Sequence, residues 1–317
     1  MMEASQQRTY KQAFAKLGWV LIASQLLMMA VVWGGEELYA RWLLWQDPMM
    51  GAAELTHRLQ NTGICLILGA LVGLVPCLAL KLTARPAQLP TLFLQENKRI
   101  SVAVMVFCLL LVLGLQNIAS LLTIPAELAA NLLGGSFYSA HESATAASQT
   151  PSMLFYSVLF APFCEELMYR GFVLQYLRPY GKTFAILFAS VIFGLMHGNI
   201  IQLPMALLCG ILFGYIALTY SLPASMVLHS LTNLTAEAIG WLSAADEVAA
   251  AQVNQALFAF GLIALFLCLT KLYHPILQYV REGSAEKQTV KLLMTSPPII
   301  LLILYLIILT AMSITPI

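Results

Sequence analysis

The sequence predicts an all-α protein, a polytopic integral membrane helix bundle with about eight to nine transmembrane helices. Of its 317 residues, 60% are hydrophobic and only 10% are charged. A soluble domain carries about 25% charged residues, so this chain has too little polar surface to fold in water. A helix needs about 20 mostly apolar residues to cross a bilayer, and many runs here reach that length. We therefore expect residues 1–317 to form a single membrane domain surrounded by lipid.

Nine apolar runs are the candidate spans. They cover residues 13–34, 62–82, 99–123, 153–177, 183–200, 202–220, 223–241, 253–273 and 297–315. The first run follows a polar, basic start and lacks a small-residue cleavage site, which predicts a retained helix and not a signal peptide. The runs between 183 and 220 are short, so one of them is a candidate re-entrant segment.

Three polar stretches separate these runs. Residues 35–61 and 124–152 are predicted to be outer loops, the second with a short surface helix, and residues 274–296 a charged cytoplasmic link. Two pairs with GxxxG spacing, Gly69/Gly73 and Gly210/Gly214, predict close helix packing.

The basic residues predict the orientation in the membrane. Lys and Arg gather in alternate loops, at Arg8, Lys11, Lys16, Lys81, Arg85, Lys98, Arg99, Arg178, Lys182, Lys271, Arg281, Lys287 and Lys291. The opposite loops hold only Arg41 and Arg58. By the positive-inside rule the N-terminus is cytoplasmic and the C-terminus lies outside. Without organelle-targeting signals, we expect the plasma membrane.

The sequence EELMYR at 165–170 places three ionisable residues inside an apolar run. A similar sequence, EELYAR at 36–41, follows the first run and has other charged residues nearby, so we expect a solvated helix start there. Glu165 lies thirteen residues before Arg178, or about 20 Å along a helix, which places it within the hydrocarbon. An ionisable group there costs at least about 2.5 kcal/mol and normally faces a cavity or a partner.

The helical spacing assigns different surroundings to the two acids. Glu166 and Arg170 are four residues apart, which predicts an ion pair on one helix face. Glu165 projects about 100° away from Glu166 and can face a cavity. A purely structural ion pair would need only one glutamate.

Further polar residues follow in the next apolar runs. FGLMH at 193–197 places His197 about 20 Å from the same cytoplasmic turn as Glu165 and on the helix face of Phe193. HSLTN at 229–233 places His229 and Asn233 one turn apart on one face. Such residues inside membrane helices mark functional sites.

Several familiar sites are absent from the sequence. There is no HExxH, GxSxG, P-loop or GxGxxG pattern. The net charge of +1 says nothing about partners. No nucleic-acid partner is expected for this membrane bundle. Water activated by Glu and His is the leading mechanism.

These motifs in this order resemble the CPBP family of intramembrane proteases, which includes the CAAX prenyl endopeptidases, bacteriocin-processing and immunity proteins, and Abi proteins. The resemblance covers residues 150–241, the predicted catalytic core. It implies that Glu165 activates the hydrolytic water with help from His197. It also implies that His229 and Asn233 bind the oxyanion, worth about 3–4 kcal/mol per donor. Glu166 and Arg170 would hold the site in register, with Phe193 supporting it.

The resemblance implies a substrate that is a peptide or a membrane-protein segment, such as a prenylated or leader-type peptide. Two His and two Glu can ligate zinc, and the family has been described as metal-dependent. The two glutamates project in different directions, however, so a metal-free glutamate mechanism without a cofactor is favoured.

Two other functions remain open. A non-catalytic relative, such as a bacteriocin-immunity or peptide-binding protein, would keep the same residues without hydrolysis. A proton-coupled transporter would use them as a relay, but transporters commonly contain internal repeats, and none is apparent.

Overall fold

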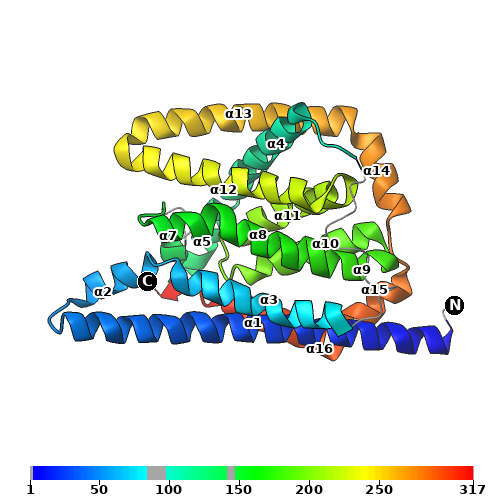
Figure 1. Cartoon of the computed structure of the whole chain (residues 1–317). Helices are drawn as coiled ribbons and strands as arrows, with labels where there is room; N and C mark the ends of the chain where they lie inside the picture. Colours follow the sequence, from blue (N-terminus) through cyan, green and yellow to red (C-terminus); the bar gives the residue numbers. More distant parts are fainter. Residues whose placement is uncertain (1–2, 84–97, 141–146, 317) are drawn as a thin grey trace.

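The computed structural model describes residues 3–83, 98–140 and 147–316 and is built almost entirely from helices (Figure 1). The α-helices are α1 Ala4–Gln46, α2 Ala52–Gln60, α3 Ile64–Thr83, α4 Val102–Leu121, α5 Thr123–Leu132, α7 Pro151–Phe155, α8 Ala161–Glu166, α9 Gln175–Leu177, α10 Lys182–Met196, α11 Gln202–Thr219, α12 Leu222–Ala245, α13 Glu247–Lys271, α14 Tyr273–Glu282, α15 Lys287–Met294 and α16 Pro297–Ala311. Two short strands, β1 Gly135–Ser136 and β2 Thr315–Pro316, pair antiparallel. The predicted all-α membrane bundle is confirmed.

Each of the nine predicted apolar runs contains a helix, but fewer helices have the length and apolarity of a membrane span. In the described part of the chain four helices meet these criteria, or six if two bent helix pairs each count as one span. The run 153–177 is divided into short α and π segments, and α12 contains polar residues that lower its hydropathy. α10, at fifteen residues, is too short to cross, in line with the expected short run.

The polar stretches are more helical than expected. Residues 35–61 are not a loop: α1 continues through Gly34 and Gly35 to Gln46, and α2 follows. EELYAR therefore lies inside a helix and does not start one. The link 274–296 is also mostly helical, in α14 and α15. The short surface helix expected within 124–152 is present as α5.

The segment with the unusual polar residues lies in the middle of the bundle. Figure 1 shows α8 and α10 between a layer that contains α12 and α13 and a layer that contains α1, α3 and α16. Contacts join α8 to α3 and α12, and α10 to α11 and α16. Buried Met168 and Phe193 belong to the core on the α1 side, and Phe213 and Leu228 to the core on the α4 side.

The two glycine pairs lie at close helix contacts, as their spacing predicted. Gly69 and Gly73 in α3 face Met28 of α1, and Gly214 in α11 faces Ile186 of α10. A Cβ atom at Gly210 would lie 3.2 Å from the Arg170 guanidinium, so this glycine makes room for that side chain.

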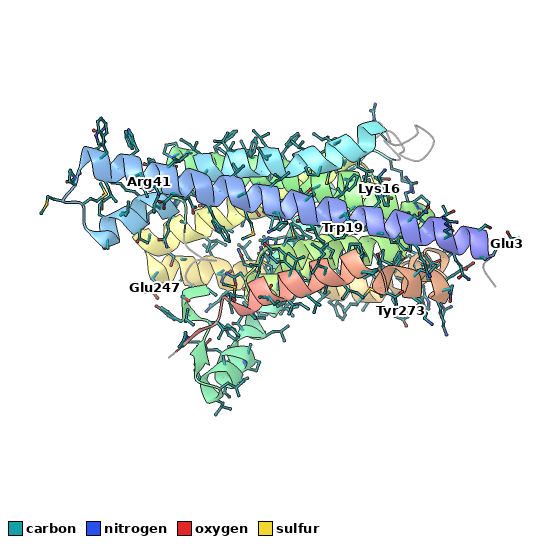
Figure 2. The ribbon with its side chains drawn as sticks, turned by 90° about the horizontal axis from the view of Figure 1, so that it is seen from below. Glu3, Lys16, Trp19, Arg41, Glu247 and Tyr273 are labelled. Atoms are coloured by element: carbon teal, nitrogen blue, oxygen red, sulfur yellow. The ribbon has the colours of Figure 1, made fainter. Side chains whose placement is uncertain are left out.

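Helix α1 runs the whole length of the molecule. Figure 2 shows Glu3 and Arg41 at its opposite ends, with Trp19 between them. The second glutamate of EELYAR, Glu37, pairs with Arg41 at 2.8 Å, and the two side chains are 61% and 74% exposed. Unlike Glu166 and Arg170, this pair lies on the surface of the protein.

Candidate active site

Polar residues from three helical segments meet in the centre of the bundle. Glu165 and Glu166 end α8, His197 follows the last residue of α10, and His229 and Asn233 lie one turn apart in α12. Direct contacts join Glu165 and Glu166 to His229. His197 contacts Phe193, whose ring also packs against His229, and Asn233 bonds to Ser157.

Glu166 is the buried anchor of this cluster, with a side chain that is 0% exposed. One carboxylate oxygen, Oε1, accepts from Arg170 Nη1 at 2.7 Å and lies 3.0 Å from His229 Nδ1. The other, Oε2, accepts from the Ser225 hydroxyl at 2.6 Å. The predicted ion pair is present, and Glu166 joins α8 to α12.

Arg170 is almost fully buried and makes contacts beyond the ion pair. It belongs to a π-helical segment, Leu167–Leu174, and its Nη2 donates to the Gly210 carbonyl at 3.3 Å. Its guanidinium carbon lies 4.3 Å from the centre of the Phe193 ring, within cation–π range. Because π-helical turns are often found at functional sites, this local geometry supports a functional region.

Glu165 has different surroundings from Glu166, as the helical spacing predicted. Its side chain is 30% exposed, and its Oε2 lies 3.7 Å from His229 Nε2. The His229 ring thus lies between the two acids, with one nitrogen directed at each. Phe213 stacks on this ring with 4.8 Å between centroids and limits its rotation.

His197 is held by the end of its own helix. Its Nδ1 lies 2.8 Å from the Phe193 carbonyl, which can only accept, so Nδ1 carries the proton. The other nitrogen, Nε2, then has a lone pair available to accept a proton. Between the described residues no hydrogen bond joins His197 to Glu165. The Phe193 ring packs edge-on against both histidines and so joins His197 to His229.

Asn233 contacts the start of the same chain segment as the acids. Its amide nitrogen donates to the Ser157 carbonyl at 2.8 Å. Ser157 belongs to a second π-helical segment, Tyr156–Phe160, directly before α8. One amide hydrogen is engaged in this bond, and the second is available for a ligand.

Ser225 is a residue that the sequence analysis missed. It is fully buried in the first turn of α12, four residues before His229. Its hydroxyl donates to Glu166. The signal was present, because residues 225, 229 and 233 share a helix face. A serine in an apolar run, however, is ordinarily satisfied by its own backbone, and nothing in the sequence connects it to Glu166.

We expect Ser225→Ala to destabilise the protein by about 1–3 kcal/mol, because Glu166 would lose a neutral donor inside the bundle. Activity should fall only slightly, since Arg170 and His229 still bind Glu166. Thermal unfolding in detergent measures the change, and Ser221→Ala tests the specificity. Ser221 caps α12 through the Ala224 N–H and makes no contact with Glu166. Equal activity loss in both variants would contradict the assigned contact.

The donor set does not fit a zinc site. Within the described residues, no group of three or more His, Cys, Asp or Glu side chains is arranged to hold a metal ion. Both oxygens of Glu166 already accept from protein donors, and His229 Nδ1 faces one of them.

Comparison with known proteins identifies one segment of the chain. Residues 147–235 match the family model described as type II CAAX prenyl endopeptidase Rce1-like. The searches of curated proteins and of solved structures gave no match. The matched segment contains the candidate residues predicted from sequence, so the resemblance proposed for residues 150–241 is confirmed.

Proposed function

Because residues 147–235 match the model of type II CAAX prenyl endopeptidases, we propose that this chain is an intramembrane endopeptidase. In this proposal a glutamate activates the hydrolytic water. The substrate is a peptide bond in a membrane-associated chain, such as a prenylated or leader-type peptide. The family match supports the CAAX-type protease class. The roles of the individual residues and the kind of substrate go beyond this match and are proposed here.

One observation supports this function above all: a partly exposed carboxylate lies beside a histidine that a second, buried carboxylate holds in place. Glu165 is 30% exposed, and Glu166 is fully buried and paired. A structural ion pair explains Glu166 and Arg170 but leaves Glu165 without a structural reason. A general base needs this combination of access to water and a fixed neighbour.

In the proposed reaction Glu165 takes a proton from water, and the resulting hydroxide attacks the carbonyl carbon of the scissile bond. His197 Nε2 accepts a hydrogen bond from the same water and orients it. The tetrahedral intermediate then collapses, the C–N bond breaks, and Glu165 returns its proton to the leaving amine. Every proton is accounted for, and no cofactor is required.

His229 and Asn233 are the proposed donors to the oxyanion. Because the Glu166 carboxylate can only accept, His229 Nδ1 carries a proton toward it. His229 Nε2 can then donate only in the imidazolium form. In that form Arg170 and His229 carry two positive charges that balance Glu165 and Glu166. Preorganised donors of this kind stabilise charge most effectively where water is excluded.

A peptide-cleavage assay of the purified chain in detergent or liposomes, with and without a strong chelator, tests the enzyme class. We expect hydrolysis of a membrane-associated peptide that the chelator does not reduce, because the described donor set does not form a metal site. Loss of activity with the chelator, restored by zinc, would overturn the metal-free mechanism. Peptide binding without cleavage would instead favour a non-catalytic, immunity-type relative.

A further inference from the structure

A second buried carboxylate lies on α12, two turns beyond His229. Glu237 is 8% exposed and accepts three hydrogen bonds from neutral donors. These come from the Ser148 N–H at 2.7 Å, the Ser148 hydroxyl at 2.5 Å and the Ser157 hydroxyl at 2.6 Å. Glu237 follows the end of the matched segment 147–235, and the mechanism above gives it no role.

Glu237 binds the hydroxyl of Ser157, and the carbonyl of the same residue accepts the hydrogen bond from Asn233. In the π-helical turn, the Ala161 N–H bonds to the Tyr156 carbonyl and not to that of Ser157. The next residue, Pro162, has no N–H to offer. The helix therefore leaves the Ser157 carbonyl without a backbone donor, and Asn233 supplies one at 2.8 Å.

Asn233 and Glu237 thus hold the same residue from one face of α12. They are four residues apart, as are His229 and Asn233, so the three side chains form one row. Asn233 binds the backbone of Ser157 and Glu237 binds its hydroxyl. Glu237 also fixes Ser148, the residue that leads into the catalytic segment, and Trp241 Nε1 donates to the Ser148 carbonyl at 3.1 Å.

We propose that Glu237 is a positioning residue for Asn233, and this inference rests on the proposed oxyanion role of Asn233. By fixing Ser157, Glu237 fixes the carbonyl that orients the Asn233 amide, so the second amide hydrogen points at the substrate. The role depends on the charge of the carboxylate. A glutamine can accept from the Ser148 N–H only if its NH2 group faces the two hydroxyls. The charge-assisted bond from Ser157 is then replaced by a weaker neutral bond of opposite direction.

Steady-state kinetics of Glu237→Gln test the proposal. We expect kcat to fall between about tenfold and about a hundredfold at unchanged KM, because a small displacement of a donor weakens only the transition-state contact. In an Asn233→Ala background the same change should cause no further loss, since the residue it positions is gone. Glu237→Asp, which keeps both acceptor oxygens, should recover part of the rate. Equal losses in both backgrounds, or none in either, would overturn the inference.

The chain offers a matched control for this experiment. Glu127 in α5 is also partly buried and accepts from the Ser136 hydroxyl and the Phe137 N–H, both at 2.7 Å, away from the candidate site. Glu127→Gln should leave kcat and KM unchanged. If it lowers kcat as Glu237→Gln does, the effect reflects the loss of any loop anchor, and the inference fails.

Two further measurements cover the remaining outcomes. If Glu237→Gln does not fold, Ser157→Ala removes the hydroxyl that Glu237 binds but keeps the carbonyl that Asn233 binds, and it should show the same kcat loss. Hydrogen exchange gives a readout without catalysis: residues 156–161 should exchange faster in Glu237→Gln and not in Glu127→Gln. A chain that hydrolyses no peptide but shows this exchange pattern contradicts the proposed function alone. Unchanged exchange in an active enzyme contradicts the positioning role alone.

Discussion

Glu165→Gln is expected to reduce peptide hydrolysis by about 10²–10⁴-fold while the protein still inserts and folds. A glutamine cannot take a proton from water, and the loss of a general base has an effect of this size. The fold should persist because the side chain is 30% exposed and the buried contacts of Glu166 do not depend on it. His197→Ala should also abolish cleavage, since its Nε2 is the second proposed acceptor for the water. Cleavage of a membrane-associated peptide by purified, reconstituted protein measures both changes.

The chain contains its own control for this prediction. Glu36 is the first glutamate of EELYAR and lies in α1, where Glu37 and Arg41 form an exposed pair. Glu36→Gln removes the same charge from nearly the same sequence and should leave hydrolysis unchanged. Full activity of Glu165→Gln, or equal loss in Glu36→Gln, would rule out Glu165 as the base.

Arg170→Met is expected to destabilise the protein by about 3–5 kcal/mol, because it leaves a fully buried carboxylate without its cation. Glu166 would then keep only Ser225 and His229 as partners. The guanidinium packing on Phe193 would be lost as well. The melting temperature in detergent measures the effect, and activity should fall with it because Glu166 positions His229.

Two further variants test whether the loss of stability comes from leaving a buried charge unpaired. Glu166→Gln combined with Arg170→Met removes both charges and should be less destabilised than Arg170→Met alone. Arg41→Met breaks an ion pair of the same spacing whose side chains are largely exposed, and its stability should change by no more than about 0.5 kcal/mol. Equal destabilisation in Arg41→Met and Arg170→Met would contradict the assigned role of burial.

The fold class and the anchor of the site could be predicted because they depend on local spacing and composition. The four-residue interval between Glu166 and Arg170 fixes their contact in any helix. The apolar surroundings predict burial, and the helical angle predicts that Glu165 points elsewhere. All three features are present in the structure. The glycine pairs also predicted close packing correctly, because only a missing side chain permits such approach.

The remaining features depend on tertiary contacts or on backbone details that local patterns do not contain. The π-helical turns at 156–160 and 167–174 break the regular period, and nothing in the residue pattern indicated them. Ser225 and Glu237 gain their importance only from partners that are distant in the sequence. The loop predicted at 35–61 was wrong because a polar stretch between two apolar runs can also be helical, and Gly34 and Gly35 do not interrupt the helix. The α1 helix continues through them, with Gly35 against Cys65 of α3.

The length of α1 explains why EELYAR is exposed although the nearly identical EELMYR is largely buried. Its 43 residues extend about 65 Å, roughly twice the thickness of the hydrocarbon layer. If residue 24 sits at the bilayer midplane, residue 38 lies about 21 Å away, beyond the half-thickness of about 15 Å. EELYAR is then immersed in the headgroup zone, where carboxylates keep their hydration. Position in the bundle, and not the letters of the motif, sets the two copies apart: one pair lies on the surface at the end of a long rod, the other inside the protein.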